Sequence, residues 1–566
     1  MKAPNLQYND AAMQQEPYFD LGTYTRSIST KSKSAQSWFD RGWKWAYGFN
    51  HEEAIRCFER ASREDPDCAL PLFGSAYCLG PNYNKPWEVF DDDERAANLR
   101  RARSALMEAK EKGSSSPVES ALVAALEHRY SQDVAGTESE AYAIWNKDYA
   151  EAMSRVYQQY GEDLDVAALY ADALMNLTPW VLWDLRTGEP TDGSRTLEAK
   201  EVLERAIAQP EGDEHPGLLH LYIHLMEMSA HPEAAISIAV RLRGLVPDAG
   251  HLHHMPTHLD VLCGDWERAI VSNSEAILAD ERYLARAGAL NFYSLYRSHN
   301  YHFRIYAAMF AGQFRVAMET VEMLDASLPE QLLRVESPPM ADWLESFLAM
   351  RVHVFIRFGR WSDILELELP KDRNLYCVTT AMIHYAKGVA YAVTDKVKDA
   401  ERVRRLFHDA VSKVPPSRTL FNNTAVDILG VAAAMLNGEL EYRLANIDLG
   451  FEYLRQAVDL SDNLPYDEPW GWMQPPRHAY GALLLEQDRI EEATAVYEAD
   501  LGLNDTLPRA LRHPNNIWAL HGLHECVKRS HRDEEAEKIR PMLEDCQAKA
   551  DVPISSSCFC RTEMSR

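Results

Sequence analysis

Histidines are concentrated in the middle third of this 566-residue chain, at spacings that suit a helix face. The pairs His220/His224 and His254/His258 are each four residues apart, and residues three or four apart share one face of a helix. The chemistry-bearing residues of this stretch are His220, His224, Glu227, His251, His254, His258, His299 and His302. Each pair is therefore predicted to present two imidazoles together.

The two pairs also repeat along the chain. His254 follows His220 by 34 residues, and His258 follows His224 by the same interval. This interval is the length of one helix–turn–helix repeat, so the pairs are expected on equivalent helices of neighbouring repeats. Within the 34-residue repeat, His220 and His224 fall one position later than His254 and His258. This offset is the main geometric objection to placing the two pairs on equivalent helices.

Imidazole is a ligand for zinc, copper, iron and nickel, and facing helices commonly build such sites. We predict that the metal ligands are His220, His224, His254, His258, His299 and His302. Glu227 and His251 are predicted as further ligands or acid–base groups, and Tyr301 and Tyr222 as phenolic hydrogen-bond donors. Any one of these histidines, taken singly, is better explained by local hydrogen bonding inside a packed helical core, and it is their repetition along the chain that favours a metal or catalytic site.

The number of histidines leaves the chemistry open. Seven nitrogens exceed the four ligands of a structural zinc ion, so either two metals lie close together or some imidazoles act as acids and bases. A nitrogen-rich site favours copper or iron and an oxidoreductase that uses dioxygen. Three histidines with an open position would instead favour zinc and a hydrolase or lyase.

A repeat pattern in residues 38–66 predicts the elements that position these side chains. Its members are Trp38, Gly42, Trp45, Ala54, Phe58, Ala61 and Pro66, at positions 4, 8, 11, 20, 24, 27 and 32 of a 34-residue unit. This is the tetratricopeptide (TPR) pattern, in which small residues let two helices approach and aromatic residues fill the gap. Weaker copies are centred on Ala234, Ala269 and Ala317. The predicted fold is an all-α, right-handed, TPR-like solenoid whose concave groove carries the histidines.

The expected organisation is continuous along the chain. It has an N-terminal extension (1–34), N-terminal repeats (35–130), central repeats with the histidines (131–330), C-terminal repeats (331–545) and a tail (546–566). Segments 80–92, 178–196 and 467–478 are rich in proline, glycine and tryptophan, as loops are. We expect them to pack on the helices or turn a corner rather than line a ligand cavity. Cys558 and Cys560 are interpreted as part of a mobile tail, with a Cu(I) or redox pair as the alternative.

The charge, the cysteines and the missing motifs disfavour several classes of partner and function. The 59 Lys and Arg against 86 Asp and Glu give a net charge of −27, which disfavours nucleic acids and anionic membranes as partners. Nine cysteines and no visible secretory signal suggest a cytoplasmic protein with reduced thiols. Nucleotide-binding glycine motifs and the HExxH zinc motif are not found in the sequence.

The runs HPGLLHLYIHLMEMSAHPEAA, VPDAGHLHHMPTHL and SHNYHF, with GPNYNKPW and SSSCFCR, resemble large TPR proteins of bacteria and fungi. The resemblance extends from about Trp38 to Cys560. It implies the solenoid, and it implies that the seven central histidines belong to shared motifs; no common reaction is known for the family. The sequence thus favours a metal-dependent enzyme acting on a small organic molecule. The alternative is a TPR scaffold that binds a protein partner through its groove without catalysis.

Overall fold

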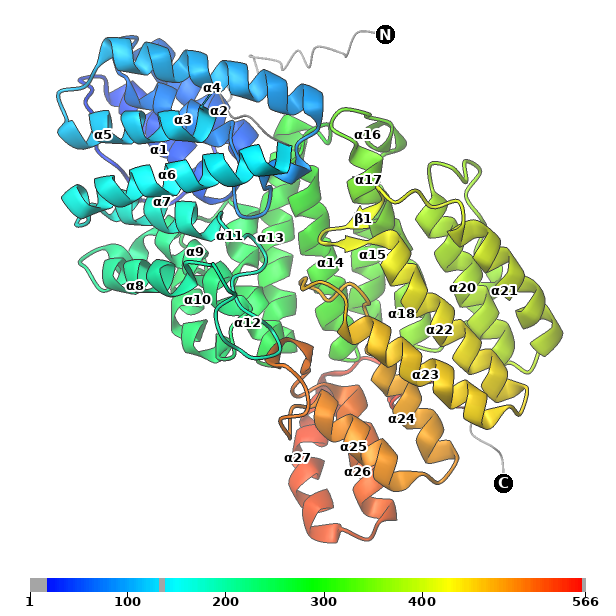
Figure 1. The fold of residues 1–566 in the computed structure, drawn as a ribbon. Helices are drawn as coiled ribbons and strands as arrows, with labels where there is room; N and C mark the ends of the chain where they lie inside the picture. Colours follow the sequence, from blue (N-terminus) through cyan, green and yellow to red (C-terminus); the bar gives the residue numbers. More distant parts are fainter. Residues whose placement is uncertain (1–17, 132–137, 562–566) are drawn as a thin grey trace.

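The computed structural model describes residues 18–131 and 138–561, which form helices joined by turns and one short hairpin (Figure 1). Successive helices pair as antiparallel hairpins that stack on their neighbours, so the fold is the expected all-α, TPR-like solenoid. No helix within the described residues is long and apolar enough to cross a membrane.

The first part of the solenoid comprises α1 (Lys33–Tyr47), α2 (His51–Glu64), α3 (Leu70–Cys78), α4 (Asp92–Lys112), α5 (Pro117–Leu126), α6 (Glu138–Tyr160), α7 (Leu164–Met175) and α8 (Thr196–Ile207). The middle part comprises α9 (Pro216–Glu227), α10 (Ile236–Leu242), α11 (Gly250–His254), α12 (Pro256–Leu262), α13 (Trp266–Ala287), α14 (Ser294–Phe310) and α15 (Phe314–Ser327).

The last part begins with α16 (Glu330–Leu333), α17 (Met340–Leu344), α18 (Met350–Arg357), α19 (Trp361–Glu366), α20 (Cys377–Val393) and α21 (Val397–Val411). An antiparallel hairpin follows, formed by β1 (Thr419–Leu420) and β2 (Asn423–Thr424), with Leu420 opposite Asn423. The chain ends with α22 (Ala425–Arg443), α23 (Ile447–Asp462), α24 (Pro476–Glu486), α25 (Ile490–Asp500), α26 (Ile517–Arg529) and α27 (Asp533–Lys549).

The first hairpin shows why the repeat pattern folds this way. Phe58 of α2 is fully buried between Gly42 of α1 and Gly74 of α3. A Cβ atom at either glycine would lie 2.7 Å from the Phe58 ring, closer than real Cβ contacts allow. The small residues of the pattern are therefore required by the crossing of the helices, as the sequence predicted.

The turn between α1 and α2 is tight and aims one aromatic ring inward. The Asn50 side chain accepts a hydrogen bond from the Glu53 amide at 3.2 Å and caps α2. Phe49, directly before it, has a φ of 56°, which lies in the left-handed region that non-glycine residues rarely adopt. The solenoid curls back on itself so that α1 also packs against α9. This contact brings the α1–α2 turn to the central histidines.

The two ends of the described chain are packed. Tyr18 and Leu21, before α1, are buried in the same apolar core that extends to Cys560. The Tyr497 hydroxyl hydrogen-bonds to Ser557 at 2.5 Å, and Cys558 and Cys560 are joined by a disulfide. The tail up to residue 561 is therefore anchored, contrary to the mobile tail expected from the sequence. The rest of the predicted extension and tail, residues 1–17 and 562–566, lies outside the described residues.

Candidate metal centre

Six buried histidines form two adjacent triads at the centre of the solenoid. In each triad, one ring nitrogen of every histidine lies within 4.8 Å of the others. The first triad is His220, His224 and His251, and the second triad is His254, His258 and His299. The ring centroids of His224 and His258, one from each triad, are 5.8 Å apart. Two groups of three imidazoles thus lie side by side.

Four helices, α9, α11, α12 and α14, supply these side chains. Helix α9 carries His220 and His224, one turn apart, and their ring centroids are 4.8 Å from each other. The run predicted as one helix is divided into α11 and α12, because Pro256 lacks the amide hydrogen that a continuous helix needs. The division preserves the contact between His254 and His258, whose ring centroids are 4.7 Å apart.

In the first triad, the nitrogens that face one another have no hydrogen-bond partner within the described chain. The Nδ1 of His220 lies 2.6 Å from the carbonyl oxygen of Tyr47, which can only accept, so Nδ1 donates and Nε2 keeps its lone pair. The Nδ1 of His224 lies 3.0 Å from Glu227 Oε1. The Nε2 atoms of both residues, and both ring nitrogens of His251, are buried and unpartnered.

Hydrogen bonds also fix the tautomer of His254 in the second triad. The Asn273 amide nitrogen donates to Thr257 and to the Ala269 carbonyl, so its oxygen faces His254 Nδ1 at 2.8 Å. His254 therefore donates from Nδ1 and has a lone pair on Nε2. That Nε2 lies 2.8 Å from the Nε2 of His258. His258 in turn is held at Nδ1 by Glu227 Oε2 at 2.7 Å.

One carboxyl group connects the two triads. Glu227 contacts His224 with Oε1 and His258 with Oε2. A second carboxyl, Glu468, reaches the same Nδ1 of His258 at 2.5 Å from the segment before α24. Burial raises the pKa of Glu227 to about 8, although His258 opposes the shift, and burial raises the pKa of Glu468 to about 8 as well. Both groups are able to hold or release a proton near neutral pH.

Burial favours the neutral form at five of the six imidazoles of the site. Burial, reinforced by neighbouring imidazoles, lowers the pKa well below its ordinary value at His220, His224, His251, His254 and His299. Neutral imidazole is the form that binds a metal, because a protonated ring nitrogen has no lone pair to donate.

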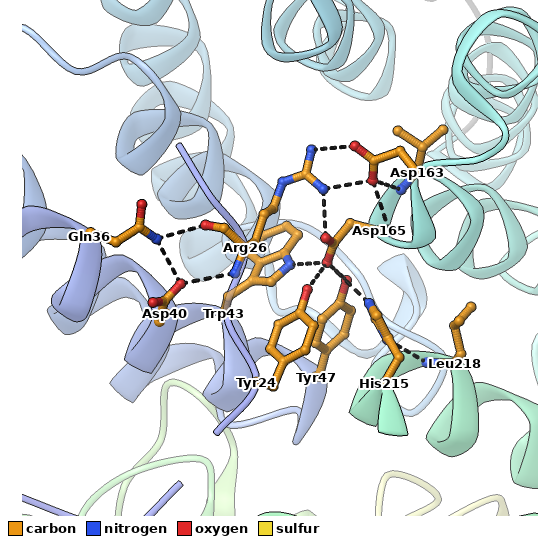
Figure 2. A network of polar contacts seen from close by, with 11 residues as sticks. Tyr24, Arg26, Gln36, Asp40, Trp43, Tyr47, Asp163, Asp165, His215 and Leu218 are labelled. Carbon is orange, nitrogen blue, oxygen red and sulfur yellow. Dashed lines mark hydrogen bonds and ion pairs between the residues drawn. The ribbon is translucent and has the colours of Figure 1, made fainter. Parts of the chain in front are cut away.

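A buried network around Asp165 anchors the start of α9 to α1 (Figure 2). Asp165 accepts hydrogen bonds from Trp43 at 2.7 Å and from the Tyr47 hydroxyl at 2.5 Å, and its ion pair with Arg26 is 2.6 Å long. His215 also contacts Asp165, at 3.3 Å, and caps α9 by accepting from the Leu218 amide. Tyr47 binds Asp165 through its hydroxyl and His220 through its backbone carbonyl. The network therefore sets the position of the first triad.

Aromatic residues from loops and turns enclose both triads. Phe49 stacks on His251, Tyr83 contacts His224, and Phe421 at the tip of the β-hairpin contacts His299. Five of the six histidines are at most 1% exposed, and His299 is 7% exposed. The histidines therefore lie in a closed interior rather than on the open concave groove predicted from the sequence. The segments 80–92 and 178–196 take part in this enclosure, since Trp180 also contacts His224.

Several predicted site residues lie elsewhere. His302 is outside both triads, and its Nε2 lies 2.8 Å from the sulfur of Met473. Tyr301 is buried next to Asp280 and Arg297, and Tyr222 donates to Glu204 at 2.8 Å. Residues one or two apart in a helix point about 100° or 200° away from each other, so closeness to a histidine in sequence does not place these tyrosines on its face of the helix.

Other site residues were missed by sequence reasoning. Glu468 belongs to the segment 467–478, which was predicted to turn a corner, and Asn273 is an unremarkable member of α13. Tyr47 contributes a backbone oxygen, which no side-chain pattern reveals. Only the acidic pair Asp467–Glu468 within an aromatic loop was a usable signal.

No family model matches the chain, and no curated protein matches it. Among solved structures, the APC/C hetero-tetramer Cut9–Hcn1 matches with 13% identity over 88% of this chain and 78% of the other, at a TM-score of 0.31. Naa15/Naa10 bound to HypK-THB matches with 12% identity over 92% of this chain and 72% of the other, at a TM-score of 0.21. These overlays are too loose to transfer a function.

Proposed function

We propose that the two histidine triads bind transition-metal ions and that the protein is a metal-dependent enzyme acting on a small organic molecule. The observation that carries this proposal is the shared orientation of the imidazoles. His220, His224, His254 and His258 are each held at Nδ1 by an oxygen atom of the protein. The Nε2 atoms of His254 and His258 face each other, and those of His220 and His224 are buried without a hydrogen-bond partner within the described chain. Metal-binding histidines are oriented in this way by their outer partners.

The donor set favours a redox metal. Each triad supplies three imidazole nitrogens, which suit copper, iron and zinc, and the described site contains no cysteine ligand. We favour two ions of copper or iron over zinc, and an oxidoreductase, because ions of this kind supply one-electron and dioxygen chemistry. Glu227 and Glu468 would hold or release a proton beside His258 Nδ1 and so set the charge of the centre, and the aromatic enclosure would exclude water. A zinc hydrolase or lyase is the runner-up.

Titration of metal-free protein with Cu(II), Fe(II) and Zn(II) tests this proposal. Two equivalents should bind, and changing His220 and His251 together to alanine should remove one of them. Dioxygen uptake by the copper- or iron-loaded protein with candidate substrates would then favour oxidation, and tight binding of zinc alone would favour hydrolysis. Failure of all three metals to bind would contradict the proposal.

An interaction scaffold in the cytoplasm is the second candidate, and the TPR-like fold favours it. Helical-repeat solenoids expose long surfaces that bind proteins. Recovery of a stoichiometric protein partner by the metal-free chain, with no change when the triads are mutated, would support this function.

A further inference from the structure

A cavity of about 160 Å³ lies next to the first triad, and Phe49 connects the two. Phe49 lines this cavity, and its ring also contacts His220 with a centroid separation of 4.5 Å. The rest of the wall comes from the start of α2, the loop after α3, helix α4 and the turn before α14. A dry cavity of about 150 Å³ holds a molecule the size of benzene, so a ligand of about six to eight non-hydrogen atoms fits.

Four buried polar atoms of residues in this wall have no hydrogen-bond partner within the described chain. They are Asn50 Nδ2, His51 Nε2, Glu52 Oε2 and Glu94 Oε2. The His51 Nδ1 donates to the Cys78 carbonyl at 3.1 Å, so His51 Nε2 is an acceptor. Three of the four unpartnered atoms are therefore hydrogen-bond acceptors. The one donor is the side-chain amide of Asn50, a residue that is 1% exposed. Buried polar groups are normally satisfied, so the wall is complementary to a ligand rich in donors.

The charges of the wall point to a cation. Glu52 and Glu94 face one buried ammonium, that of Lys85, which lies 2.5 Å from Glu94. Arg101 also lines the cavity, but its side chain is 54% exposed and pairs with Glu59 outside. Burial raises the pKa of the Glu52 carboxyl, although the Phe292 amide and the charges of Arg56 and Lys85 oppose the shift. Arg56 is itself paired with Glu53 at 3.0 Å. One more positive charge would balance the wall.

The aromatic rings of the wall also suit an ammonium group. Lys85 Nζ lies 4.3 Å from the Phe90 ring centroid and 4.1 Å from that of Phe292, so two rings already hold one ammonium by cation–π contact. Phe49 and Tyr293 provide further ring surface beside the unpartnered acceptors.

We propose that this cavity binds a small organic cation with a primary ammonium group, about the size of benzylammonium, held by Glu52, Glu94 and His51. We further assign this cation as the substrate class of the adjacent histidine centre; that assignment, unlike the binding itself, rests on the proposed function. The Phe49 ring lines the cavity and contacts His220, so it lies between the bound cation and the histidine centre.

The test is isothermal titration of the metal-free full chain with benzylamine and with benzyl alcohol, which has a similar shape but no charge. Benzylamine should bind and benzyl alcohol should not. Glu52→Gln and, separately, Glu94→Gln should each weaken benzylamine binding at least tenfold, whereas the exposed Glu111→Gln on α4 should leave it unchanged. Circular dichroism of each variant verifies folding, and the comparison of the two probes on wild-type protein needs no variant.

The outcomes separate the two proposals. Absence of benzylamine binding, equal binding of both probes, or folded variants with wild-type affinity would overturn the inference, whatever the metal content. Metal analysis of the same preparations addresses the histidine centre independently, because Glu52 and Glu94 contact none of its six histidines. Amine binding by a chain that takes up no metal would retain the binding site and remove its assignment to catalysis.

Discussion

His254 and His258 meet through their Nε2 atoms at a distance of 2.8 Å. Each ring is fixed from behind, His254 by Asn273 and His258 by Glu227. One of the two facing nitrogens must carry a proton when they bind only each other, whereas both lone pairs are available when they bind a metal. The same geometry thus serves as a hydrogen bond or as two corners of a metal site.

The outer partner of His254 should control metal affinity. Asn273→Leu removes the oxygen that accepts from His254 Nδ1 at 2.8 Å, and we expect the affinity of the second triad to fall by about 10- to 100-fold. Asn273→Asp retains an acceptor at this position and should stay near wild type. Competition titration with a chelator measures both. Equal affinity of the leucine variant and wild type would show that this partner does not orient a ligand.

Two histidines of α14 should behave differently. His299→Gln should lower the metal content of the protein, because His299 belongs to the second triad. His302→Gln should leave it unchanged, because the Nε2 of His302 faces Met473 instead. Elemental analysis of the two variants decides between this arrangement and the six-ligand set predicted from the sequence, in which both changes would release metal.

Breaking the Asp165 network should destabilise the whole chain. Asp165→Asn removes the 2.6 Å ion pair of the buried Arg26, which keeps only Asp163 at 2.8 Å, and removal of one member of a buried pair costs up to about 3–5 kcal/mol. Tyr47→Phe removes only a hydroxyl bond to a charged group, at about 1.5–3 kcal/mol, and keeps the carbonyl that holds His220. Thermal melting should rank the two in this order, with metal binding preserved in Tyr47→Phe. A wild-type melting temperature for Asp165→Asn would contradict the expectation.

A second buried network makes the fold sensitive to acid. Burial lowers the pKa of His478 to about 4, with Arg357 adding to the shift and Asp500 opposing it. Between the ordinary pKa of about 6.5 and about 4, the unfolded chain binds a proton that the folded chain does not. As the pH is lowered from about 6.5 to about 4, the free energy of unfolding should therefore decrease, and this group alone should account for about 3 kcal/mol of the decrease.

The matched comparison is His478→Gln, in which this proton is absent from both states. Apart from Asp500, which His478 contacts, the other groups keep the same surroundings in the two proteins, so denaturation of the metal-free chains between pH 7 and pH 4 should show a shallower decline in the variant. Parallel declines would exclude His478 as a source of the acid sensitivity.

The helical repeat and most of the site were predictable from local sequence. Small and aromatic residues at fixed positions predicted the Gly42–Phe58 contact, and the 34-residue interval predicted that the pairs beginning at His220 and His254 would be neighbours. These predictions succeeded because helix faces and repeat stacking depend on residues close in the chain.

The remaining features depend on how distant segments meet. Glu468 reaches His258 across 210 residues of sequence, and Phe49 reaches the first triad because α1 packs on α9. Closure of the solenoid interior follows from these contacts, which explains why the open groove expected from the repeat pattern is wrong at the histidines. The predicted division into segments 1–34, 35–130, 131–330, 331–545 and 546–566 stays a prediction, since one apolar core extends through the described chain.

Elemental analysis of the purified protein tests the central claim most directly. Wild-type protein should contain one or two equivalents of copper or iron. The variant with both His254 and His258 changed to alanine should lose the metal of the second triad, whereas His253→Gln, at a histidine that contacts the Pro247 carbonyl instead, should retain it. Wild-type protein that contains no transition metal and takes none up, or a double variant with undiminished metal, would contradict the account.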